Sequence, residues 1–168
     1  MERTKATQTA LPFAAQRRVV QAAGPMQTPN DVVVALSGFT GQATGDLRAL
    51  EETIRAAMQE PRSNEIDSAL FGLFERFPEE DGYGVFWSIV HGLERRGGYE
   101  GSLLASVQRS PSPFSLLMLN RLLNAGQKLC AGTPIFPILE HLSAEGVAPL
   151  VQQEATRFLA HQRQRGVE

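Results

Sequence analysis

The side chains that most often carry out acid–base or metal chemistry are few and far apart in this chain. His91, His141 and His161 are separated by about 50 and 20 residues. They lack the His-Glu-x-x-His or His-x-x-x-His spacing that places two imidazoles on one helical face to bind a metal. His91, Glu94 and Arg95 lie near one another on one expected helix, and an enzyme with an unrecognised active site around them remains an alternative. The spacing of the histidines otherwise predicts no metal site.

The remaining candidates for nucleophilic or phosphate chemistry are also incomplete. Cys130 has only Lys128 as a basic neighbour, so no nearby sequence feature activates its thiol. Residues 82–84, Gly-Tyr-Gly, form half of a dinucleotide-binding glycine pattern, and the chain has no Gly-Lys-Ser/Thr phosphate loop. We therefore expect no catalytic residue and no cofactor, and the sequence predicts that the protein is not an enzyme.

Two groups of neighbouring carboxylates remain, Glu51 with Glu52, and Glu79 with Glu80 and Asp81. Adjacent residues on a helix point about 100° apart, so neither group resembles a catalytic pair. The second group lies between two expected helices, where three carboxylates would gather at one edge and could meet a basic surface. We predict all five as candidate contacts with a partner protein, with ordinary solvated charge as the alternative.

The overall composition limits the classes of partner. Sixteen Lys and Arg against eighteen Asp and Glu give a net charge of −2, which does not favour nucleic-acid binding. No apolar run approaches the ~20 residues needed to span a bilayer, and no secretory signal is visible near the N-terminus. A lone cysteine fits a reducing compartment. These features predict a soluble, cytoplasmic protein with no membrane partner, and leave its oligomeric state open.

From residue 46 onward, apolar side chains recur at the three- and four-residue steps of amphipathic helices. About seven helices are expected, starting near residues 46, 64, 83, 99, 113, 134 and 148. Asn64 is the expected N-cap of the second helix. Ser112 is the expected N-cap of the fifth helix, and Pro113 suits its first helical position. Because the links are short, we predict an all-α fold of antiparallel hairpins, stacked as an irregular α-solenoid or a helical bundle.

Two of the expected helices have unusual faces. The segment 114–124 is apolar around most of its circumference, which predicts a central helix. Its polar side chains, Asn120, Arg121 and Asn124, should reach solvent or bond to neighbouring backbone. On the helix starting near residue 83, the aromatic residues are expected in the core, although an exposed Trp87 would indicate an interface.

The first 45 residues differ from the rest of the chain. They are rich in Thr, Gln, Ala, Gly and Pro, and contain turn signals at residues 24–25 and 29–31. Within them, residues 31–39 favour a short helix, with a β-strand as the alternative because of the run of three valines. We therefore divide the chain into a poorly specified N-terminal extension, residues 1–45, and an all-α domain, residues 46–168.

Two stretches resemble a known group of proteins. They are residues 84–94, GVFWSIVHGLE, and residues 106–126, SVQRSPSPFSLLMLNRLLNAG, within about a quarter of the chain. They resemble small helical immunity proteins of bacterial polymorphic toxin systems, and the most distinctive positions are Arg109, Pro111, Asn120, Arg121 and Asn124. The resemblance implies a cytosolic protein that binds a cognate toxin domain and neutralises it without doing chemistry.

Three functional hypotheses follow from these observations. The first is an immunity protein whose partner is a cognate toxin domain. The second is a helical adaptor or scaffold that binds a host protein between its hairpins and has no toxin partner. The third is the unrecognised enzyme around His91. A toxin gene beside the gene for this protein would separate the first hypothesis from the second.

Overall fold

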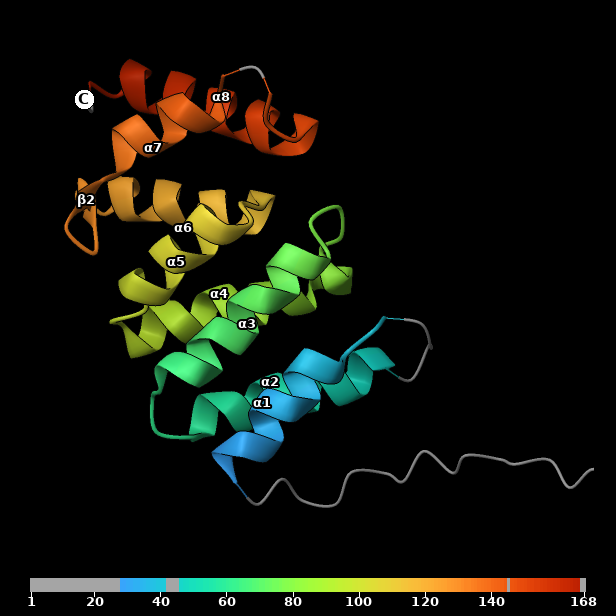
Figure 1. The fold of residues 1–168 in the computed structure, drawn as a ribbon. Helices are drawn as coiled ribbons and strands as arrows, with labels where there is room; N and C mark the ends of the chain where they lie inside the picture. The colour runs from blue at the N-terminus through green and yellow to red at the C-terminus, as the bar shows by residue number, and fades with distance from the viewer. Residues whose placement is uncertain (1–27, 42–45, 145, 167–168) are drawn as a thin grey trace, which may run out of the picture.

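The computed structural model describes residues 28–41, 46–144 and 146–166, and most of these are helical (Figure 1). The structure confirms the all-α prediction. The elements are α1 (Pro29–Gly38), α2 (Asp46–Gln59), α3 (Asn64–Arg76), the 3-10 turn η1 (Gly82–Gly84), α4 (Val85–Arg96), α5 (Glu100–Arg109), α6 (Pro113–Asn124), β1 (Leu129–Cys130), β2 (Thr133–Pro134), α7 (Ile135–Leu142) and α8 (Pro149–Gln164).

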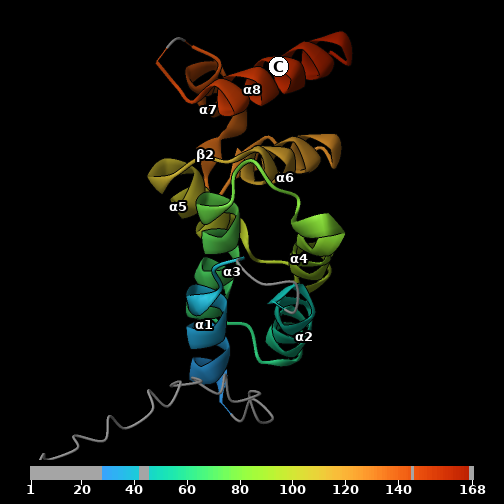
Figure 2. The same cartoon turned by 90° about the vertical axis from the view of Figure 1, so that its right-hand side faces the viewer.

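The helices form layers of antiparallel neighbours that stack along one axis (Figures 1 and 2). Helices α1 and α2 lie at one end, α3 and α4 come next, α5 and α6 follow, and α7 and α8 close the other end. Helix α3 packs against both α1 and α5, α2 packs against α4, and α6 packs against α8. Each helix therefore buries its apolar face against the next layer, as in an α-solenoid.

An aromatic cluster joins the second layer to the third. The rings of Phe74 and Phe114 stack with centroids 5.0 Å apart, and Phe86 meets both edge-on at 5.4 and 5.6 Å. Helix α6 carries Phe114 and buries seven of its twelve residues, which confirms its prediction as a helix enclosed on most sides. The cluster therefore fixes α3, α4 and α6 relative to one another.

Side chains cap the starts of α6 and α3, at the predicted residue in α6 and at its neighbour in α3. Ser112 and Ser115 form a capping box, and Pro113 occupies the first turn of α6, as predicted. The N-cap of α3, however, is Ser63 and not Asn64, because the Ser63 hydroxyl accepts a hydrogen bond from the backbone N–H of Ile66 at 3.2 Å. Both residue types are good caps, and the sequence alone does not choose between neighbours.

Helix α1 confirms the short helix expected within residues 31–39, and it packs against α2 and α3. Its buried contacts come from Val32 and Leu36. The guanidinium group of Arg76, on α3, donates to the carbonyl oxygens of Leu36 at 2.7 Å and of Ser37 and Phe39 at 2.8 Å. Arg76 thus satisfies the carbonyls at the C-terminal end of α1, which a helix cannot satisfy internally.

A short hairpin that the sequence did not predict links α6 to α7. Strands β1 and β2 pair antiparallel, and the turn residues Ala131 and Gly132 both have positive φ angles, 48° and 83°. Such a turn usually contains Asn or Gly at both positions. Because Ala131 occupies the first position, the sequence carries no clear signal for the turn. The hairpin places Cys130 in the core, with its thiol 3.2 Å from the carbonyl oxygen of Glu100.

Arg76→Ala should lower the free energy of unfolding by about 1–3 kcal/mol, because it leaves the α1 carbonyls without their charged donor. Chemical denaturation followed by circular dichroism measures the change. Arg48→Ala is the matched control, since the ion pair of Arg48 with Glu52 is exposed and its loss should cost about 0.5 kcal/mol or less. Equal losses in the two variants would contradict the role given to Arg76.

Burial should make Cys130 unreactive in the folded protein, because it raises the pKa of the thiol from 9.0 to about 11. Near pH 8, reaction with a thiol reagent should be at least about 100-fold slower than in denaturant. Since the folded pKa is raised, this thiol favours folding below about pH 9, and its contribution is lost as the pH rises through about 11. Rapid labelling of the native protein would contradict the burial.

Candidate partner-binding surface on helices α2 and α4

Helices α2 and α4 approach closely because α4 carries a glycine at their contact. Gly92 is buried, and a Cβ atom at this position would lie 2.5 Å from the sulfur of Met58 on α2. Any larger residue would therefore push against Met58. The glycine lets the methionine side chain fill the space between the two helices.

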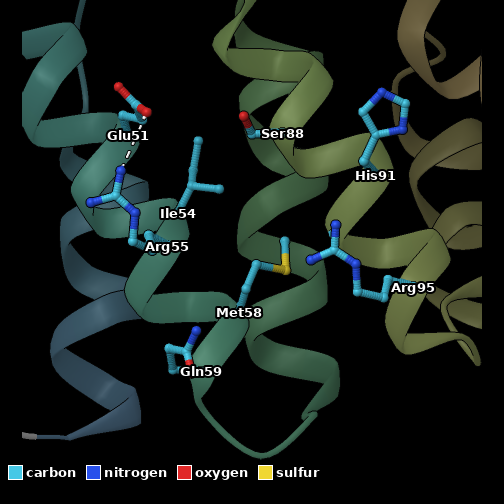
Figure 3. Close-up of a pocket in the computed structure, with 9 residues that line it drawn as sticks. Glu51, Ile54, Arg55, Met58, Gln59, Ser88, His91 and Arg95 are labelled. Carbon is cyan, nitrogen blue, oxygen red and sulfur yellow. Dashed lines mark hydrogen bonds and ion pairs between the residues drawn. The ribbon is translucent and has the colours of Figure 1, made fainter.

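An open cleft of about 350 Å³ lies along this contact (Figure 3). Its walls are Glu51, Ile54, Arg55, Met58 and Gln59 from α2, and Ser88, His91, Gly92 and Arg95 from α4. Arg95 extends from α4 toward Met58, whereas the ring of His91 stands at the rim and points away from α2 (Figure 3). The cleft thus has an apolar floor and charged walls.

An aromatic side chain continues the surface beyond the cleft. Trp87 is 39% exposed, and its ring stacks on that of His91 with centroids 5.7 Å apart and an interplanar angle of 28°. The other side of the indole meets Phe114 of the aromatic cluster edge-on at 5.8 Å. The core contact fixes the orientation of Trp87, while part of the ring faces solvent. Phe86, by contrast, is buried as the sequence predicted.

The carboxylate of Glu94, at the back of this surface, is held by an arginine from the next layer. Arg121 of α6 donates through Nε and Nη2 to the two carboxylate oxygens, the second at 2.7 Å. This bonding raises the pKa of Arg121. His91 Nδ1 lies 3.8 Å from the same carboxylate. The His91–Glu94 pair therefore exists, but Arg121 occupies both oxygens that a catalytic carboxylate would use, and Arg95 lies in the cleft.

The five predicted partner contacts do not form one surface cluster. Glu79, Glu80 and Asp81 are exposed in the link between α3 and η1. Glu51 lines the cleft and pairs with Arg55 at 3.3 Å, and Glu52 pairs with Arg48 at 3.2 Å on the exposed side of α2. Only Glu51 thus belongs to the α2–α4 cleft.

His91 and Arg95 were predicted only as members of a possible enzyme site, and not as contacts with a partner protein. Trp87, His91 and Arg95 follow one another at four-residue steps, which place side chains on one face of a helix. All three are exposed, whereas the opposite face of α4 is buried. The four-residue spacing could have indicated that these side chains share one face of the helix. No motif, however, distinguishes a binding face of aromatic and basic residues from any other exposed helix face.

Most of the distinctive residues of the immunity-protein resemblance form hydrogen bonds or ion pairs between helices of different layers. Arg109 on α5 donates to Glu75 of α3 at 2.9 and 2.6 Å. Asn120 and Asn124 on α6 accept hydrogen bonds from the buried Gln162 of α8 at 2.6 and 2.8 Å. The prediction that these asparagines reach solvent or backbone is wrong for Asn120, which is buried and bonds to a side chain 42 residues away. Asn124 is exposed, as predicted, and also accepts a bond from Gln162.

A second, more apolar groove of about 700 Å³ lies at the other end of the stack. It is lined by the end of α5, by Pro111, by β2 and α7, and by Gly146 and Val147 in the loop before α8. Across the described residues, no group of His, Cys, Asp or Glu side chains could hold a metal ion. No helix within the described ranges is long and apolar enough to cross a membrane.

Glu94→Ala should lower the free energy of unfolding by about 1–2 kcal/mol, because it leaves the partly buried Arg121 without its acceptor. Urea denaturation measures the loss. Glu140→Ala provides the control, since the Glu140–Arg163 pair is more than half exposed on both sides and should contribute little. A Glu94 variant as stable as the control would show that this pair does not hold α4 to α6.

Comparison with known proteins places the chain in no family. No protein-family model, no curated protein and no solved structure matches it. The two resembling stretches and the geometry of the surface are therefore the features that bear on its function.

Proposed function

We propose that this protein is an immunity protein that binds a cognate bacterial toxin domain in the cytosol and neutralises it without catalysing a reaction. The observation that carries the proposal is the exposed face of α4, where Trp87, His91 and Arg95 stand in a row beside the cleft. The same helix contains the first stretch that resembles immunity proteins. Trp and Arg are the residue types most enriched among the side chains that dominate protein–protein binding.

The rigidity of the surface supports a binding role. Helix α4 is held from behind by the aromatic cluster and by the Glu94–Arg121 pair. A partner that docks on a pre-formed surface does not have to order it, and this lowers the entropic cost of association. Arg109, Asn120, Asn124 and Arg121 bond between layers, so these distinctive residues support the scaffold that carries the exposed face.

Trp87→Ala should weaken binding to the toxin domain encoded beside this gene by at least about tenfold, because it removes the largest exposed aromatic ring. Titration calorimetry of the purified pair measures the affinity. Leu129→Ala is the matched control: Leu129 is 52% exposed in the β1–β2 hairpin, away from α4, and its loss should change the affinity less than about twofold.

Growth protection tests the proposal as a whole. Cells that express the neighbouring toxin domain should survive when they also express the wild-type chain, and die when they express the Trp87 variant at equal abundance. A stable complex with a host protein and no protection would support the adaptor alternative. Protection that needs catalytic turnover, seen as full rescue at far less than one copy per toxin molecule, would contradict stoichiometric binding.

A further inference from the structure

We propose that the cleft between α2 and α4 is a carboxylate-binding site, which receives an acidic side chain from a segment of the partner protein. The inference rests on the proposed function, because it names the chemistry of the partner at the same surface. The proposal reverses the charge expected of the partner. The sequence predicted acidic contact residues in this chain, and hence a basic partner.

Arg95 is the main cation available to such a ligand. It is exposed on α4, and it makes no hydrogen bond or ion pair with any other residue that the structure describes. Its guanidinium group extends into the cleft toward Met58 (Figure 3). A guanidinium group offers five N–H donors in a planar fork that matches the two oxygens of a carboxylate.

Arg55 supplies a second cation from the opposite wall. Its only ion pair in the described structure is with Glu51 at 3.3 Å, and both side chains are more than half exposed. Such a pair is weak and exchanges readily in water. An incoming carboxylate can therefore take the place of Glu51, which makes Glu51 a competitor for the site and not a contact with the partner.

The floor of the cleft suits the aliphatic part of an acidic side chain. Ile54 is buried, and Met58 fills the space left by Gly92. These apolar atoms can contact the methylene groups of a glutamate while its carboxylate lies between Arg55 and Arg95. At about 350 Å³, the cleft has room for one such side chain and part of the segment that carries it.

A carboxylate peptide tests the site without the toxin. Full-length protein labelled with ¹⁵N is titrated with hexaglutamate and, separately, with hexaglutamine at low salt. The side-chain Nε–H signals of Arg55 and Arg95 should shift and saturate with hexaglutamate only. Arg95→Gln should weaken the binding by about two- to fivefold or more, whereas Arg48→Gln, outside the cleft, should not change it.

The variant Glu51→Gln gives the sharpest test. Glu51 should oppose the binding of an acidic partner, whereas it should favour the binding of a basic one. If Glu51 competes for Arg55, the substitution strengthens hexaglutamate binding by about two- to fivefold. Unchanged or weaker binding, or shifts spread equally over Arg48 and Arg163, would overturn the proposal. Equal or tighter binding of a short oligonucleotide would overturn it in favour of phosphate recognition.

These results are separable from the test of function. Growth protection that survives Arg95→Gln, combined with no hexaglutamate shift in the cleft, would reject the carboxylate site and retain the immunity role. Saturable hexaglutamate binding without any protection would retain the site and reject the toxin as partner.

Discussion

The stacking of Phe74 on Phe114 is the contact on which the rest of the structure depends. It joins helices that come from different layers, and Phe86 closes the cluster from α4. Because Phe114 also meets the inner edge of Trp87, the same cluster that fills the core sets the outward direction of the surface indole. An aromatic cluster buries a large apolar area with few rotatable bonds, so it can hold several helices in one arrangement. The exposed face of α4 thus depends directly on core packing.

The helices themselves could be predicted from the sequence, because each has one apolar face at helical spacing. All seven expected starts from residue 46 onward lie within two residues of the structural ones, and the short helix in residues 31–39 also forms. What the sequence could not provide were contacts between distant residues. Arg76 reaches the end of α1, and Gln162 bonds to Asn120 across α6 and α8, and neither pair has a local signal. The β1–β2 turn was missed because Ala131 adopts a conformation that alanine rarely takes.

The candidate site was harder to predict than the fold for a related reason. Charged side chains are easy to find in a sequence, but whether a charge is available depends on its neighbours in space. Glu94 looks like a candidate catalytic group until Arg121, 27 residues away, is seen to hold both its oxygens. Glu51 looks like a contact for a basic partner until it is seen beside Arg55 on the wall of a cleft that Arg95 enters. The proposed binding chemistry follows from these pairings and not from the number of charges.

The central claim is that the exposed side of α2 and α4 is where this protein holds its partner. Hydrogen–deuterium exchange of the full chain, alone and with the cognate toxin domain that the proposed function requires, is the most direct test. We expect slower exchange in peptides covering residues 46–59 and 85–96, with little change in α7 and α8. Slower exchange confined to residues 107–147, around the apolar groove, would place the partner at the other end of the stack and contradict binding at α2 and α4.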